Sequence, residues 1–90
     1  SLNPGSSYTC SGGGHLVFLG IALYDDYHWW RKDNSTGRWS HKPAAGKATD
    51  LDGSGNQILD PLTSNRYISG HNYSENGGFF CTCGNNENAR

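Results

Sequence analysis

The longest run of apolar residues in this chain lies near its N-terminus. Residues 15–23, from His15 to Leu23, consist mainly of apolar, β-branched and aromatic side chains, which is typical of a buried strand. Residues 27–33, 38–41 and 79–83 are predicted to be further strands, and residues 66–68 a short strand or turn. No segment of ten or more residues shows the apolar period of a helix. The pattern predicts an all-β fold, a small, loop-rich antiparallel sheet with a central aromatic hairpin.

The register of the central hairpin follows from its loop. Residues 34–37 form a four-residue loop that ends in glycine. This loop places Asp33 opposite Arg38 and Lys32 opposite Trp39, which predicts an ion pair and a cation–π contact. One face then carries Trp30, Lys32, Trp39, His41 and His28, and the other carries Tyr27, Trp29, Arg31 and Ser40. Because both faces carry aromatic side chains, both are predicted to contact something.

Composition fits a single small domain over residues 1–90, with an irregular lead-in at 1–14 and a flexible tail at 84–90. Only 33% of the residues are hydrophobic and 13 are glycine, but three Trp, five Tyr and three Phe favour a folded core over disorder. The net charge is −1 and no basic patch is present, so nucleic acid is not an expected partner. The longest apolar run is too short to span a membrane.

The cysteines favour an extracellular protein. Cys81 and Cys83 are separated by one residue and cannot readily pair with each other, so one of them is predicted to form a disulfide with Cys10. That bridge would close a loop of about 70 residues and stabilise the fold by about 4 kcal/mol. The third thiol would be free or would pair with another chain. Sequons at Asn34 and Asn72 predict glycosylation of a secreted protein.

One acidic loop has the pattern of a calcium site. Asp50, Asp52, Ser54 and Asn56 alternate as oxygen ligands, and Gly55 stands at the sixth position, where calcium loops turn sharply. Pro61 occupies the twelfth position, where a bidentate Glu is expected. The alternative interpretation is a solvated turn rich in Asx residues. A weaker metal hypothesis places zinc among His15 and the three cysteines. Otherwise no cofactor is predicted.

Three blocks of this sequence resemble a known signature. They are residues 26–33 (Asp-Tyr-His-Trp-Trp-Arg-Lys-Asp), residues 39–43 (Trp-Ser-His-Lys-Pro), and the Thr49, Asp50, Ser54-Gly55-Asn56, Ile58 and Asp60-Pro61 positions. The chain resembles a poorly characterised microbial family whose longer members look like papain-like cysteine hydrolases. That resemblance implies the β-half of a papain-like α+β fold, with His15 at the position of the catalytic histidine. The Asn-Cys-Tyr block of the longer members is absent here, and Ala44 replaces a glycine. The nucleophile would therefore lie outside this chain.

Three functions remain open from the sequence. The favoured hypothesis is a secreted, non-enzymatic module that associates with other chains, including copies of itself, in an assembly, filament or matrix. The second is the C-terminal portion of a cysteine hydrolase. The third is a glycan- or calcium-binding module whose binding residues are Trp29, Trp30, Trp39, His28 and His41. The alternative role for each tryptophan is packing in the core.

Overall fold

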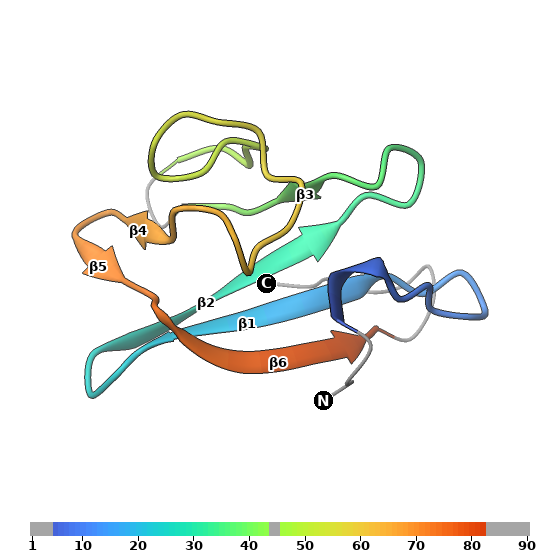
Figure 1. Ribbon diagram of the computed structural model, residues 1–90, viewed down its shortest axis with the longest axis horizontal. Coiled ribbons are helices and arrows are strands. Elements are labelled where there is room, and N and C mark those ends of the chain that lie inside the picture. The colour runs from blue at the N-terminus through green and yellow to red at the C-terminus, as the bar shows by residue number, and fades with distance from the viewer. Residues whose placement is uncertain (1–4, 44–45, 83–90) are drawn as a thin grey trace.

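The computed structural model describes residues 5–43 and 46–82. A short 3-10 helix, η1 (Gly5–Ser7), precedes the strands β1 (Leu16–Ala22), β2 (Asp26–Lys32), β3 (Trp39–Ser40), β4 (Tyr67–Ile68), β5 (His71–Asn72) and β6 (Glu75–Cys81). Four strands form a sheet in the order β3-β2-β1-β6, and β4 pairs with β5 in a separate hairpin. Every strand pairing is antiparallel (Figure 1). The fold is therefore all-β, as predicted, with no α-helix in the described residues.

The apolar run forms the centre of the sheet. β1 pairs with β2 on one side and with β6 on the other. Leu16 and Phe18 are almost completely buried, and they share the core face of the sheet with Trp30 and Phe79. Gly20 lies on this face as well, where an added Cβ would lie 2.6 Å from the Trp30 ring. The glycine inside the apolar run therefore makes room for an indole from the next strand.

β6 begins four residues earlier than the sequence predicted. Its first half contains Gly77 and Gly78, and the register with β1 shifts between Leu19 and Gly20. A Cβ on Gly77 would lie 2.7 Å from the Leu19 side chain, so only glycine lets the two strands approach here. The described part of the strand ends at Cys81, and the predicted end at Cys83 lies outside the described residues.

The predicted hairpin register is confirmed. Lys32 lies opposite Trp39, and the Asp33 N–H donates to the Arg38 carbonyl at 2.8 Å. The two predicted side-chain contacts are wrong. Asp33 accepts two hydrogen bonds from Ser35, because a short acidic side chain readily bonds to the nearby donors of its own turn. Lys32 Nζ donates to the carbonyl of Ser6 at 3.0 Å. Within the described residues, the one ion pair joins His71 and Asp25.

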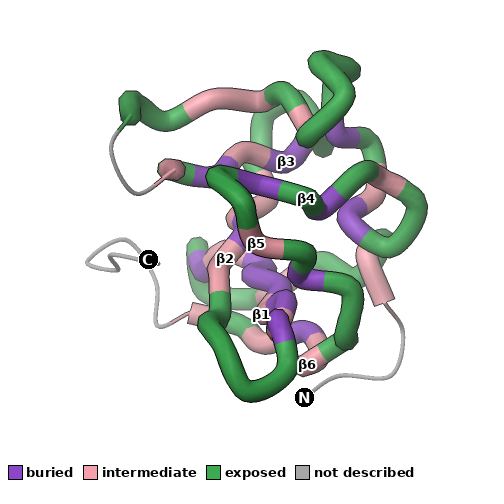
Figure 2. Tube along the Cα trace, turned by 90° about the vertical axis from the view of Figure 1, so that its left-hand side faces the viewer, coloured by how far each residue is buried: buried purple, intermediate pink, exposed green. Residues whose placement is uncertain are grey.

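The two faces of the sheet differ in what covers them. The segment from residue 46 to Tyr73 lies over the core face, and Ile58, Ile68 and Tyr73 are buried there (Figure 1, Figure 2). Cys10, in the lead-in, packs against the same core. On the opposite face, which we call the open face, Val17 is buried, but the other apolar side chains are only half-buried; they are Leu19, Ile21, Trp29 and Phe80. The fold therefore leaves one apolar sheet face partly exposed.

Candidate functional site

A groove runs along the outer edge of β2, where β3 ends. It has a volume of about 460 Å³. Its lining residues come from β2 on one side and from the chain after β3 on the other; they are Tyr27, His28, Trp29, Arg31, Ser40, His41, Lys42 and Ala48. We call this hollow the β2 groove. It combines aromatic side chains with two permanent cations, and none of these lining residues is acidic.

The groove exists because β3 is too short to cover its neighbour. The observed register would place Lys42 opposite Trp29, but the pairing stops at Ser40. Pro43 follows, and proline disfavours continuation of regular backbone pairing. His41 instead exchanges two hydrogen bonds with Thr49, at 2.9 and 2.8 Å, on the far side of β3. The chain is thereby held away from β2.

In the part of the chain that the structure describes, the first half of β2 consequently has an unpaired edge, which we call the free edge. Alternate residues of β2 point their backbone groups toward β3, and Tyr27, Trp29 and Arg31 belong to this set. The Tyr27 N–H is satisfied by Asp26 Oδ1 at 2.8 Å. Within the described residues, the N–H and carbonyl of Trp29 make no backbone hydrogen bond on this side. Two strong hydrogen-bonding groups thus face the groove.

Two histidines meet at the inner side of the groove. His41 Nε2–H donates to the Leu51 carbonyl at 2.9 Å, which leaves His41 Nδ1 to accept from His28 Nε2–H at 2.9 Å. In this arrangement His41 Nδ1 is the acceptor, and His28 Nε2 carries the proton that is donated. The His28 ring also stacks on Tyr73 at 5.1 Å and meets the edge of Trp30 at 4.7 Å. Burial, together with the neighbouring His41, lowers the pKa of His28 to about 4.

A second hollow of about 510 Å³ lies on the open face, beside the β1–β2 turn. Leu19, Ile21, Tyr27 and Trp29 are among its lining residues, and Tyr27 and Trp29 also line the β2 groove. Tyr27 is 63% exposed, and the half-buried Trp29 meets Phe80 edge-on at 6.0 Å. These aromatic rings therefore connect the two hollows into one accessible surface.

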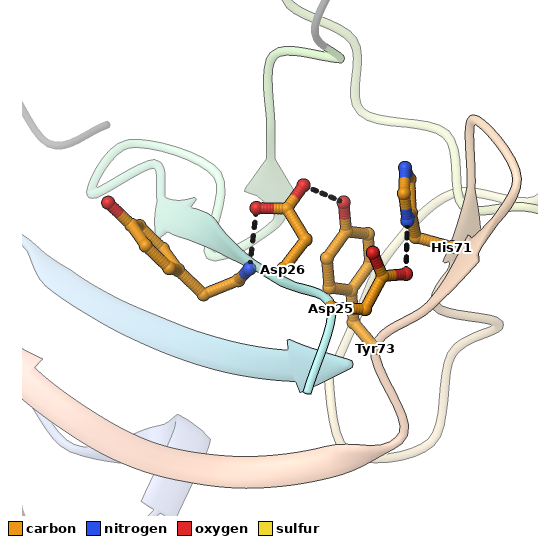
Figure 3. A network of polar contacts seen from close by, with 5 residues as sticks. Asp25, Asp26, His71 and Tyr73 are labelled. Atoms are coloured by element: carbon orange, nitrogen blue, oxygen red, sulfur yellow. Dashed lines mark hydrogen bonds and ion pairs between the residues drawn. The ribbon is translucent and has the colours of Figure 1, made fainter. Parts of the chain in front are cut away.

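The β1–β2 turn is joined to the β4–β5 hairpin by an acidic network (Figure 3). The Tyr73 hydroxyl donates to Asp26 at 3.0 Å, and His71 pairs with Asp25. Hydrogen bonds from the Tyr27 N–H and the Tyr73 hydroxyl lower the pKa of Asp26. The hydrogen bond with Asp25 raises the pKa of His71, and burial together with Asp26 raises the pKa of Tyr73 to about 12. The sequence-based reasoning did not find this network, because its members are about 46 residues apart.

The structure separates the predicted binding residues into two groups. Trp30 and Trp39 are each 1% exposed, and His41 is 5% exposed. A ring buried to this extent cannot stack on a sugar, so the predicted stacking role is wrong for these two tryptophans. Trp29 and His28 keep part of their surface and line the β2 groove. The groove also contains Lys42, which the sequence-based reasoning did not single out.

The disulfide prediction is confirmed and specified. Cys10 is bonded to Cys81, across a sequence separation of 71. The zinc hypothesis is therefore wrong, because the sulfur atoms of Cys10 and Cys81 are bonded to each other. Cys83 lies outside the described residues.

His15 lies immediately before β1. Its Nδ1 is 3.2 Å from the Lys32 carbonyl, and its Nε2 is 2.9 Å from a guanidinium nitrogen of Arg31. Because Arg31 can only donate, Nε2 accepts, and Nδ1 carries the proton that is donated to Lys32. The catalytic role that the family resemblance implies for His15 stays a prediction.

The acidic loop has the geometry of a turn centred on Asp52. Its Oδ1 accepts from the N–H groups of Ser54 and Asn56, and its Oδ2 accepts from the N–H of Asn65 at 3.1 Å. Burial opposes ionisation, but these backbone donors outweigh it and lower the pKa of Asp52. No group of three or more His, Cys, Asp or Glu side chains in the described residues is arranged as a metal site. Calcium bound by Asp50, Asp52, Ser54 and Asn56 stays a prediction.

The two sequon asparagines are exposed. Asn34 lies in the β2–β3 loop and donates to the Gly14 carbonyl at 3.1 Å, and Asn72 lies in β5. Glycosylation at these positions also stays a prediction.

Comparison with known proteins gives one informative similarity. No protein-family model and no solved structure matches the chain. The chain is similar to "Insoluble matrix shell protein 1" of Ruditapes philippinarum, with 48% identity over 51 residues. The matched segment is 57% of this chain and 34% of the relative, so the chain spans about a third of the relative's length. Among the described residues, no helix has the length and apolar character needed to cross a membrane.

Proposed function

We propose that this chain is a structural module of an extracellular matrix that acts by associating with other protein chains, including copies of itself. The observation that carries the proposal is the 48% identity to a protein named as an insoluble matrix shell protein. The Cys10–Cys81 disulfide supports an extracellular location, because disulfides persist in oxidising compartments.

The open face supports association. Monomeric proteins seldom leave large apolar side chains clustered on one surface unless something binds there. Here Leu19, Ile21, Trp29 and Phe80 are half-buried on one sheet face, and Tyr27 beside them is 63% exposed. Aromatic side chains contribute strongly to protein interfaces because each buries a large area. We therefore assign the self-association surface to the open face.

The proposal is tested by sedimentation velocity on the oxidised chain from micromolar to millimolar concentration. We expect concentration-dependent species larger than the monomer. Ile21→Lys places a charge on the open face and is expected to weaken association by at least about tenfold. Leu59→Lys is the matched control, because Leu59 is 70% exposed and lines neither hollow. Near-UV circular dichroism checks that both variants keep the packed aromatic core.

A monomer at every concentration would overturn the proposal. Equal weakening of association by Ile21→Lys and Leu59→Lys would overturn the assignment to the open face.

A further inference from the structure

We propose that the β2 groove binds an extended acidic segment of a partner chain, which pairs with the free edge of β2 as an added strand. The inference rests on the proposed function, because it names the chemistry of one matrix partner and the place where it binds. It concerns the groove edge, and not the open face to which self-association is assigned.

The backbone of β2 provides the first argument. The N–H and carbonyl of Trp29 point to the side on which β3 would have continued, and they have no backbone partner among the described residues. An unpaired strand edge is a template for another extended chain, since each added residue satisfies groups that are already aligned. Trp29 can therefore exchange two hydrogen bonds with one residue of a guest strand.

The groove is held open by contacts that a guest would not have to break. His41 is fixed by its two hydrogen bonds with Thr49 and by its bond to the Leu51 carbonyl. On the opposite wall, β2 is fixed by its pairing with β1. The two walls meet through the His28–His41 hydrogen bond at the inner side. A preformed site of this kind loses little conformational freedom on binding, which favours affinity.

The charges of the groove select the partner. Arg31 and Lys42 line it, and no lining residue is acidic, although the whole chain has a net charge of −1. The Arg31 guanidinium donates to a neutral acceptor, His15 Nε2, so no carboxylate neutralises it there. The nearby Asp26 carboxylate is already engaged by the Tyr27 N–H and the Tyr73 hydroxyl. A guest strand with acidic side chains would thus meet two cations that have no ion-pair partner within the described residues.

The geometry of an added strand also predicts an alternation in the guest. Successive side chains of a strand point to opposite faces of the sheet. One set would lie beside Trp29 and Arg31 on the open side, and the other would face His28 and His41. We therefore expect acidic residues at alternate positions of the guest, with small or apolar residues between them.

The test uses a synthetic capped peptide of alternating Val and Asp, with the alternating Val and Lys peptide as its charge control. Binding is measured by fluorescence anisotropy of the labelled peptides, and the exchange of the Trp29 amide hydrogen is followed by NMR. We expect the Asp peptide to bind, to protect the Trp29 amide and to bind at least about tenfold more tightly than the Lys peptide.

A scan of N-methyl groups along the peptide tests strand addition itself. Each N-methyl group removes one backbone donor without changing any side chain. Methylation at one alternate set of residues should weaken binding by about tenfold per position, while methylation at the other set should change it by less than about twofold. Equal effects at both sets would overturn strand addition. Displacement of the peptide by a glycan oligomer, with the Trp29 amide unprotected, would also overturn it.

Lys42→Glu tests the charge argument on the protein side. Lys42 is exposed, and its side chain makes no ion pair within the described residues, so its replacement should weaken binding without unfolding the chain. Arg38→Glu is the matched control, because Arg38 carries the same charge near β3 but does not line the groove. Equal effects of the two variants would overturn the assignment to the groove. If the peptide fails to bind while sedimentation still shows self-association, the groove inference falls and the proposed function stands.

Discussion

His28 shows how one residue ties the groove to the stability of the core. Its ring lies between Tyr73 and Trp30 and donates to His41, so there is little water to solvate a positive charge. This is why its pKa is about 4 instead of 6.5. Protonation of His28 would place a positive charge between Tyr73 and Trp30, where the rings exclude the water that would solvate it.

The shifted pKa predicts a pH dependence of stability. Between pH 6.5 and pH 4 the unfolded chain binds a proton at His28 that the folded chain does not. The free energy of unfolding should therefore be highest above pH 6.5 and should fall as the pH decreases to about 4, by about 2 kcal/mol once the partial exposure of the ring is taken into account. Urea unfolding across this range measures the fall.

The control for this prediction is His28→Gln, which keeps an N–H donor near His41 but does not titrate. Its stability should depend much less on pH in the same window. His71 contributes to stability with the opposite sign, since the hydrogen bond with Asp25 raises its pKa in the folded chain. Its stabilising contribution is present below pH 6.5 and is lost as the pH rises through the raised pKa. The contribution of Asp26 to stability changes only below pH 3.8, the ordinary pKa of an aspartate, because the fold lowers the pKa of Asp26. A wild-type profile no steeper than that of the variant would contradict the prediction.

At the scale of the element, the loop at residues 50–56 holds the layer that covers the core. Asp52 binds three backbone N–H groups, one of which belongs to Asn65 in a distant part of the same layer. Asp52→Asn removes the charge that strengthens these bonds and should reduce the free energy of unfolding by about 1–2 kcal/mol. Asp50→Asn should change it by less than about 0.5 kcal/mol, because Asp50 has one long contact, to Gln57 at 3.5 Å.

The same two variants distinguish the turn from a calcium loop. If the loop is a turn centred on Asp52, only Asp52→Asn lowers the denaturation midpoint, and added calcium does not change the midpoint of either variant. In a calcium loop, added calcium stabilises the wild type, and both substitutions remove that stabilisation. Thermal unfolding with calcium and with EDTA is the measurement.

Sequence patterns predicted some elements well and others poorly, for physical reasons. The β2–β3 register was predictable, because a four-residue loop fixes which residues face each other. The ion pair of Asp33 was not, because Ser35 is two residues away and competes successfully for the same oxygen. The start of β6 was missed, because Gly77 and Gly78 are typical of a turn, whereas here they form a bulge against Leu19.

At the scale of the whole molecule, the alternation along β2 correctly put Trp30 and Trp29 on opposite faces, but it could not show which face would be buried. That choice depends on Ile58 and Tyr73, which cover one face from segments far along the chain. The groove has the same origin, since it forms where His41 pairs with Thr49 and leaves β2. Burial and grooves of this kind are properties of the tertiary fold, whereas local patterns specify only the strands.

The disulfide links the N-terminal lead-in of the chain to β6, the edge strand of the sheet. It joins Cys10, which packs against the core, to Cys81 at the end of β6, across a sequence separation of 71. Without it, the unfolded chain would gain the freedom of a long open loop, which corresponds to about 4 kcal/mol in the chain-entropy model. A domain of this size has a total stability of roughly 5–13 kcal/mol, so the bridge is a large part of it.

The Cys10→Ala/Cys81→Ala double variant should therefore unfold at a much lower urea concentration than the oxidised wild type, with a loss of about 4 kcal/mol. Cys83→Ala is the control, because it keeps the Cys10–Cys81 bridge and should leave the midpoint unchanged. A loss below about 1 kcal/mol in the double variant would show that burial of the aromatic core stabilises the sheet without the cross-link. Self-association of the folded double variant would then separate the role of the bridge in folding from any role in assembly, since the open face does not include either cysteine.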